Sequence, residues 1–196
     1  MKRNGLYQII LKRRSVRLFK NKKILFNTIK KIIKVASFAP SAGNLQFLEY
    51  LAIDKNVLKE MIFVHTRWAG YIYPKRVPSL DKHPQLYIII LINKEKARKI
   101  DLRDVGAAGQ NILLALRCFG LGGCWIASIN KRAIRRILNI PSKYKIDSLI
   151  AAGFPAESPL LEERDDTVRY WLDKDNRFHV PKRSLKNIFH YNSLNK

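Results

Sequence analysis

The chain has 196 residues, 47% of them hydrophobic, which is enough for a substantial core and predicts a single domain over residues 1–196. It carries 38 Lys and Arg against 15 Asp and Glu, and the resulting formal charge of +23 leaves nucleic acid, an acidic membrane or an anionic ligand open as partners. The basic residues are spread along the whole chain, so general surface charge is the simplest explanation for them.

No stretch approaches the ~20 apolar residues that cross a bilayer, and the basic start is not followed by the apolar run of a secretory signal. Cys118 and Cys124 have no His beside them, which argues against a structural zinc site and favours two free thiols in a reducing compartment. We therefore expect a cytoplasmic protein that binds no metal and does not enter a membrane.

The first predicted helix covers residues 6–12 and leads directly into Arg13, Arg14, Ser15 and Arg17. Arginine presents a planar fork of donors that suits a phosphate or another delocalised anion. In an extended backbone Arg13, Ser15 and Arg17 would point to one side, and Arg14 to the other. The segment is a candidate anion site, although a solvated basic turn explains these residues equally well.

Residues 25–36 have the apolar spacing of a second helix, which ends in a loop of short side chains at residues 39–46. Such a loop leaves backbone amides open to a ligand, and Ser41, Asn44 and Gln46 add donors and acceptors. An ordinary turn between a helix and a strand is the alternative.

A strand is predicted at residues 47–53 and a helix at 55–64, followed by an irregular segment at 66–84. Long irregular segments inside a compact domain often form lids or binding surfaces. Trp68, Tyr71 and Tyr73 could therefore cover a planar ligand, or they could pack against the core of the domain.

The remaining pattern predicts a central strand, a long helix, a glycine-rich turn into a buried strand, another helix and a last core strand, at residues 86–92, 104–119, 120–128, 130–138 and 146–154. The tail after residue 155 is weakly patterned, with a short helix expected at 185–189. Its aromatic side chains would be sheltered by packing on a second subunit. The element order predicts a mixed sheet flanked by helices.

Five blocks of this sequence, taken together, resemble the nitroreductase family of flavin enzymes: residues 13–17, 39–46, 104–111, 120–126 and 153–157. They occur in the order of the family and span nearly the whole chain. The resemblance implies an α+β, three-layer sandwich with a mixed, mostly antiparallel sheet. It also implies a homodimer, with the extended C-terminal tail packed on the partner and one FMN in each of two clefts at the interface.

The resemblance also implies which residues hold FMN. Arg13, Arg14, Ser15 and Arg17 would lie along the phosphate, the ribityl chain and the pyrimidine edge. The loop carrying Pro40, Ser41, Asn44 and Gln46 would reach the flavin from the other subunit. The backbone of Ala127, Ser128 and Ile129 would approach the reactive N5 side, and Lys182 or Arg183 would return to the phosphate.

The implied activity is a ping-pong transfer of hydride from NAD(P)H through flavin N5 to a nitroaromatic, quinone or similar small-molecule acceptor. No side chain has to act as a catalytic group, and Trp68, Tyr71 and Tyr73 would contact the acceptor. Reductive dehalogenation and enone reduction on the same scaffold are alternatives. A nucleic-acid-binding protein is an alternative of another class, but it leaves the blocks at 40–46 and 106–111 unexplained.

Overall fold

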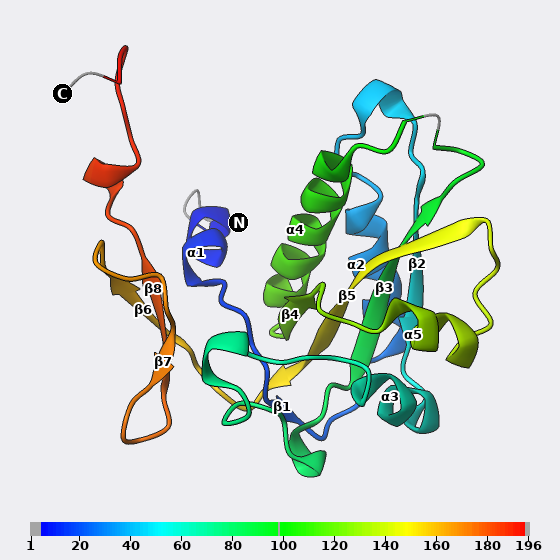
Figure 1. Ribbon diagram of the computed structural model, residues 1–196, viewed down its shortest axis with the longest axis horizontal. Helices are drawn as coiled ribbons and strands as arrows, with labels where there is room; N and C mark the ends of the chain where they lie inside the picture. Colours follow the sequence, from blue (N-terminus) through cyan, green and yellow to red (C-terminus); the bar gives the residue numbers. More distant parts are fainter. Residues whose placement is uncertain (1–4, 98, 195–196) are drawn as a thin grey trace.

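A five-stranded antiparallel sheet forms the centre of the computed structural model, which describes residues 5–97 and 99–194 (Figure 1). Strand β3 (Leu86–Asn93) pairs with β2 (Leu48–Ile53) on one side and with β5 (Tyr144–Pro155) on the other. Strands β4 (Gly122–Ile126) and β1 (Phe19–Lys20) both pair with the remaining edge of β5. The predicted α+β class with a mostly antiparallel sheet is confirmed.

Helices cover both faces of this sheet. Every residue of β3 is buried, and successive side chains of a strand point to opposite faces, so β3 contributes to a core on each side. Ile88, Ile90 and Ile92 pack in one core cluster with α2 (Phe26–Ala36) and α4 (Leu102–Cys118). Tyr87, Ile89 and Leu91 pack in a second cluster with α3 (Asn56–Phe63) and α5 (Lys131–Ile137). The result is the expected three-layer sandwich.

The segment at residues 66–84 is irregular, as predicted, apart from two short 3-10 turns, η2 (Gly70–Ile72) and η3 (Leu80–Lys82). A third such turn, η1 (Ala42–Asn44), lies in the loop after α2. None of the helices within residues 5–97 and 99–194 is long and apolar enough to cross a membrane.

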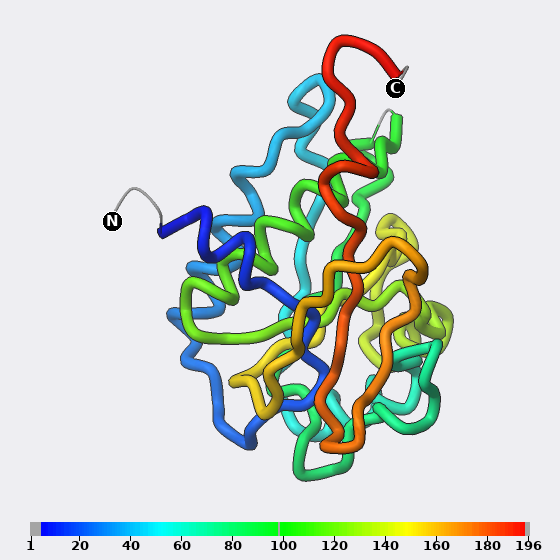
Figure 2. The backbone as a smooth tube through the Cα atoms, turned by 90° about the vertical axis from the view of Figure 1, so that its left-hand side faces the viewer, coloured from blue at the N-terminus to red at the C-terminus, as the bar shows by residue number. Residues whose placement is uncertain are grey.

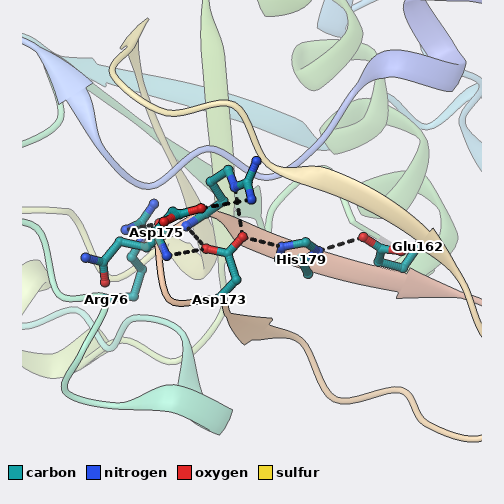
Figure 3. A network of polar contacts seen from close by, with 7 residues as sticks. Arg76, Glu162, Asp173, Asp175 and His179 are labelled. Atoms are coloured by element: carbon teal, nitrogen blue, oxygen red, sulfur yellow. Dashed lines mark hydrogen bonds and ion pairs between the residues drawn. The ribbon is translucent and has the colours of Figure 1, made fainter.

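The tail forms a second, three-stranded sheet that the sequence pattern did not predict. Strand β8 (Phe178–Lys182) lies between β6 (Leu160–Glu163), which is parallel to it, and β7 (Trp171–Leu172), which is antiparallel. Figure 3 shows the network that joins these strands, in which His179 contacts Glu162 and Asp173. The expected helix after it is only one 3-10 turn, η4 (Leu185–Asn187).

Helix α1 (Gly5–Lys12, blue) and the tail (orange to red) stand to one side of the central sheet (Figures 1 and 2). This helix is amphipathic but has no buried residue. Beyond β8, five large apolar side chains are more than half exposed: Leu185, Ile188, Phe189, Tyr191 and Leu194. The described chain therefore leaves apolar surface uncovered at both ends.

Candidate functional site

Residues 13–17, called the arginine segment below, are held along the outer edge of β4. Ser15 and Gly123 form an isolated parallel bridge, and the Val16 N–H donates a 3.0 Å hydrogen bond to the Gly123 carbonyl. Val16 packs directly on Gly122, where a Cβ atom would come within 2.7 Å of the Val16 side chain. Glycine at position 122 thus allows the backbone of the arginine segment to approach the sheet.

Arg13 and Arg14 line a cavity of about 60 Å³ with Leu113 and Arg117 of α4. Arg14 donates a 2.6 Å hydrogen bond from Nη1 to the Arg13 carbonyl, but its buried Nε has no hydrogen-bond partner among the described residues. Burial, and secondarily the charge of Arg13, lowers the pKa of Arg14. Glu157 lines the same cavity, and an anion there would offset charge of Arg13, Arg14 and Arg117.

Arg17, the last arginine of this segment, packs against aromatic side chains of the tail. Its guanidinium carbon is 4.7 Å from the centre of the Phe178 ring and 5.4 Å from that of Tyr170. Its Nε and Nη1 atoms are buried and, within the part of the chain described, have no hydrogen-bond partner. A buried donor left without an acceptor costs about 1–3 kcal/mol, so these atoms favour an anionic ligand over a closed protein core.

The backbone of Arg17 is held by Glu157, which follows β5. Glu157 Oε1 accepts from the Arg17 N–H and, at 3.1 Å, from the Leu18 N–H. Its Oε2 accepts from Nη2 and, at 3.1 Å, from Nε of Arg76. The block at 153–157 contains Glu157, but no sequence pattern pairs it with Arg76, which comes from the irregular segment.

The loop at residues 40–46 is tied to the first turn of α4. Ser41 Oγ donates a 2.6 Å hydrogen bond to Asp104 Oδ2, and the Ala42 N–H donates to Oδ1 of the same carboxylate at 3.1 Å. Gln46 Nε2 donates to Asn44 Oδ1 at 2.9 Å. Pro40, Ser41 and Gln46 line a separate cavity of about 110 Å³.

Within one chain these two groups of predicted residues are not brought together. The loop meets α4 at Asp104, whereas the arginine cavity meets it at Leu113 and Arg117. Nine to thirteen residues of helix separate these positions by about 14–20 Å. The two groups therefore contact opposite ends of α4 within one chain.

Residues 127–129 lie beside the start of the irregular segment. Ile129 forms an antiparallel bridge with Thr66, and the Ser128 carbonyl accepts a 3.0 Å hydrogen bond from the Arg67 N–H. Ala127 and Ser128 are exposed. Their predicted approach to a flavin is compatible with this exposure and stays a prediction.

Lys182 is exposed at the end of β8, and Arg183 donates a 2.6 Å hydrogen bond to the Asn187 carbonyl. In the described residues neither side chain forms a hydrogen bond or an ion pair with the arginine segment. Their predicted contact with a phosphate also stays a prediction.

The three aromatic residues proposed to contact an acceptor differ in burial. Trp68 is only 2% exposed and donates a 2.8 Å hydrogen bond from Nε1 to Thr66 Oγ1. Trp68 therefore packs in the core, which was the alternative to ligand contact, and its buried side chain is not open to a ligand. Tyr71 and Tyr73 are 56% and 66% exposed, and the Tyr71 ring centre lies 4.9 Å from that of Tyr170. These two tyrosines remain candidates.

Comparison with known proteins adds three relatives. A sequence model described as the Nitroreductase family matches residues 10–154. A protein of Archaeoglobus fulgidus, provisionally named an NADH dehydrogenase/NAD(P)H nitroreductase, is 31% identical over 172 residues, which cover 81% of this chain and 90% of that protein. The iodotyrosine deiodinase of Thermotoga neapolitana is 28% identical over 183 residues, covering 84% and 97% of the two chains. A crystal structure from Desulfovibrio desulfuricans, provisionally described as a nitroreductase in complex with FMN, has a TM-score of 0.69 and 26% identity over 84% of this chain and 94% of that one.

Proposed function

This chain is a member of the nitroreductase family, and from that premise we propose that it is an FMN-dependent oxidoreductase that uses NAD(P)H as electron donor. Nitroaromatics, quinones or similar small molecules are the proposed acceptors. The similarity to a solved structure described as an FMN complex supports the choice of cofactor.

One observation of this chain carries the proposal: the buried, unpartnered nitrogen atoms of Arg14 and Arg17. They fit a ligand with an anionic group, and the phosphate of FMN carries about two negative charges that are costly to bury without cations. Arg13, Arg14 and Arg17 would supply that compensation, and the bridge from Ser15 to Gly123 would hold them in place.

When bound, FMN supplies hydride chemistry at its N5 atom. The residues of this chain would bind and orient it. A cation of residues 13–17 close to the pyrimidine edge would favour the negatively charged reduced form of the ring. Tyr71 and Tyr73, exposed on the irregular segment, are the proposed contacts for an acceptor.

We also propose a homodimer in which each site takes its arginines from one chain and the loop at residues 40–46 from the other. The family resemblance of both blocks motivates this arrangement, since within one chain they contact α4 at opposite ends, at Asp104 and at Leu113 and Arg117. The exposed apolar side chains of α1 and of the tail after β8 provide surface for a second copy, including the proposed packing of the tail on its partner.

Reductive dehalogenation is a second candidate reaction, favoured by the similarity to the deiodinase of Thermotoga neapolitana. The two candidates differ in product. Protein supplied with NAD(P)H and FMN would release halide from a halogenated phenol only in the second case, whereas loss of nitroaromatic absorbance would indicate the first.

The test of the cofactor compares FMN with riboflavin, which lacks the phosphate. A ligand that binds only the native state raises its thermal stability. We expect the melting temperature to rise with FMN and much less with riboflavin, and the purified protein to show flavin absorption. A colourless protein that is stabilised by neither compound would contradict the proposal.

A further inference from the structure

The buried pair of Arg76 and Glu157 contacts the arginine segment through the backbone of Arg17. The two side chains are 10% and 5% exposed, and the carboxylate accepts two hydrogen bonds from the Arg76 guanidinium. The same carboxylate accepts from the backbone N–H groups of Arg17 and Leu18. Glu157 therefore accepts a hydrogen bond from the backbone of Arg17 but forms its ion pair with Arg76.

This division leaves the guanidinium of Arg17 unpaired. Its Nε and Nη1 are buried without a partner in the described residues, and the Phe178 and Tyr170 rings brace it. If Arg76 were absent, Glu157 would be a buried carboxylate without a countercharge, next to a cation with free donors. A buried charge that loses its partner is strongly destabilised and attracts another cation. Arg17 is the candidate, because its guanidinium packs on the same Phe178 ring as that of Arg76.

Arg76 is itself held in place from the tail. Its Nη1 lies 3.5 Å from the Asn176 carbonyl, and its guanidinium carbon is 5.7 Å from the centre of the Phe178 ring. The irregular segment, the tail and the arginine segment thus meet at one carboxylate. The buried and paired Arg76 therefore differs from the solvated basic residues that make up the general surface charge.

We propose that Arg76 is a positioning residue that neutralises Glu157 and thereby keeps the Arg17 side chain available to FMN. The inference rests on the proposed function, since it assigns Arg17 to the cofactor. It gives the irregular segment a part in cofactor binding in addition to its proposed contact with the acceptor.

The test measures the dissociation constant of FMN by quenching of its fluorescence in four proteins: the wild type, Arg76→Met, Arg76→Lys and the double variant Arg76→Met/Glu157→Gln. We expect Arg76→Met to weaken FMN binding about tenfold or more, because the freed carboxylate competes for Arg17. Arg76→Lys keeps the countercharge and should lose less. The double variant removes the competing charge and should recover most of the affinity.

Recovery in the double variant would identify the uncompensated charge of Glu157, and not the loss of the Arg76 side chain itself, as the cause of weaker binding. Wild-type affinity in folded Arg76→Met, or a folded double variant that binds no better than Arg76→Met, would overturn the inference alone. A wild-type protein that does not bind FMN would overturn the proposed function and the inference with it. If Arg76→Met does not fold, as judged by circular dichroism, the double variant decides, since it should fold and bind FMN within a few-fold of the wild type.

Discussion

The hydroxyl of Ser41 donates a 2.6 Å hydrogen bond to Oδ2 of Asp104, and this contact joins the loop at residues 40–46 to the first turn of α4. Asp104 is only 5% exposed, and it also accepts the backbone N–H of Ala42. The carboxylate therefore holds the loop by side chain and backbone together.

We predict that Asp104→Ala loosens this loop. Removing the carboxylate leaves the Ser41 and Ala42 donors without an acceptor, which should cost about 1–3 kcal/mol of stability. Amide hydrogen exchange should become faster at residues 40–46. Asp101→Ala is the control, because Asp101 caps α4 through the Arg103 N–H and does not touch the loop. It should lower the melting temperature without faster exchange in the loop, and equal exchange in both variants would contradict the assignment.

The second prediction concerns pH and the three-stranded sheet of the tail. His179 Nδ1 lies 2.6 Å from Glu162 Oε1, and its Nε2 lies 3.1 Å from Asp173 Oδ2 (Figure 3). These contacts, with Asp173 the larger cause, raise the pKa of His179, while the contact with His179 lowers the pKa of Asp173. The other groups around the ring are Trp171, stacked at 4.9 Å, Arg177 on Asp173, and Arg164 over Trp171.

A group whose folded-state pKa is raised stabilises fully below its unfolded pKa, about 6.5 for histidine, and loses that effect as pH rises through the folded value. The amides of β8 should therefore exchange faster, after correction for intrinsic rates, as pH rises above about 6.5. His179→Gln should remove this dependence, and His190→Gln, a change at an exposed histidine, should not. Protection of β8 that is independent of pH in the wild type would refute the prediction.

A mixing experiment tests whether the site is shared between chains. One variant carries Arg13→Ala and Arg17→Ala. The other carries Asn44→Gly and Gln46→Gly, which remove two side chains at positions where φ is +54° and +47° and glycine is not strained. Each variant alone should bind FMN weakly.

In a mixed dimer, one site would combine the intact arginines of one chain with the intact loop of the other. Random exchange of chains should restore wild-type affinity at roughly a quarter of all sites, because half of the dimers are mixed and each has one intact site. A mixture that binds no more FMN than the average of the two variants would mean that each site is built from a single chain.

The long elements were predictable because local pattern determines them. The continuous apolar run of β3 identifies a strand buried on both faces, and the small residues of α4 predict a close neighbour. That neighbour is Trp125, whose ring would lie 2.5 Å from a Cβ atom at Gly109. The missed strands are short and depend on distant partners: β1 has two residues, and Phe19 pairs with Pro155.

In the candidate site, too, local sequence pattern was predictive and contacts between distant residues were not. Arg13, Arg14 and Arg17 stand together in the sequence, so their chemistry was visible before the fold was known. The pairing of Arg76 with Glu157 joins residues 81 positions apart and leaves no local signature. Likewise, the length of the irregular segment left open whether Trp68 contacts a ligand or packs in the core, and its hydrogen bond to Thr66 and its burial place it in the core.

The central claim is that the arginine segment binds the anionic part of FMN, and an FMN titration of three proteins tests it most directly. These are the wild type, Arg13→Ala/Arg17→Ala, and the control Lys30→Ala/Lys34→Ala, whose lysines are exposed on α2. Loss of two charge-assisted contacts should raise the dissociation constant by about 100-fold or more, whereas loss of two solvated charges should change it by less than about threefold. Equal losses in the two variants, or a wild-type protein that does not bind FMN, would contradict the account.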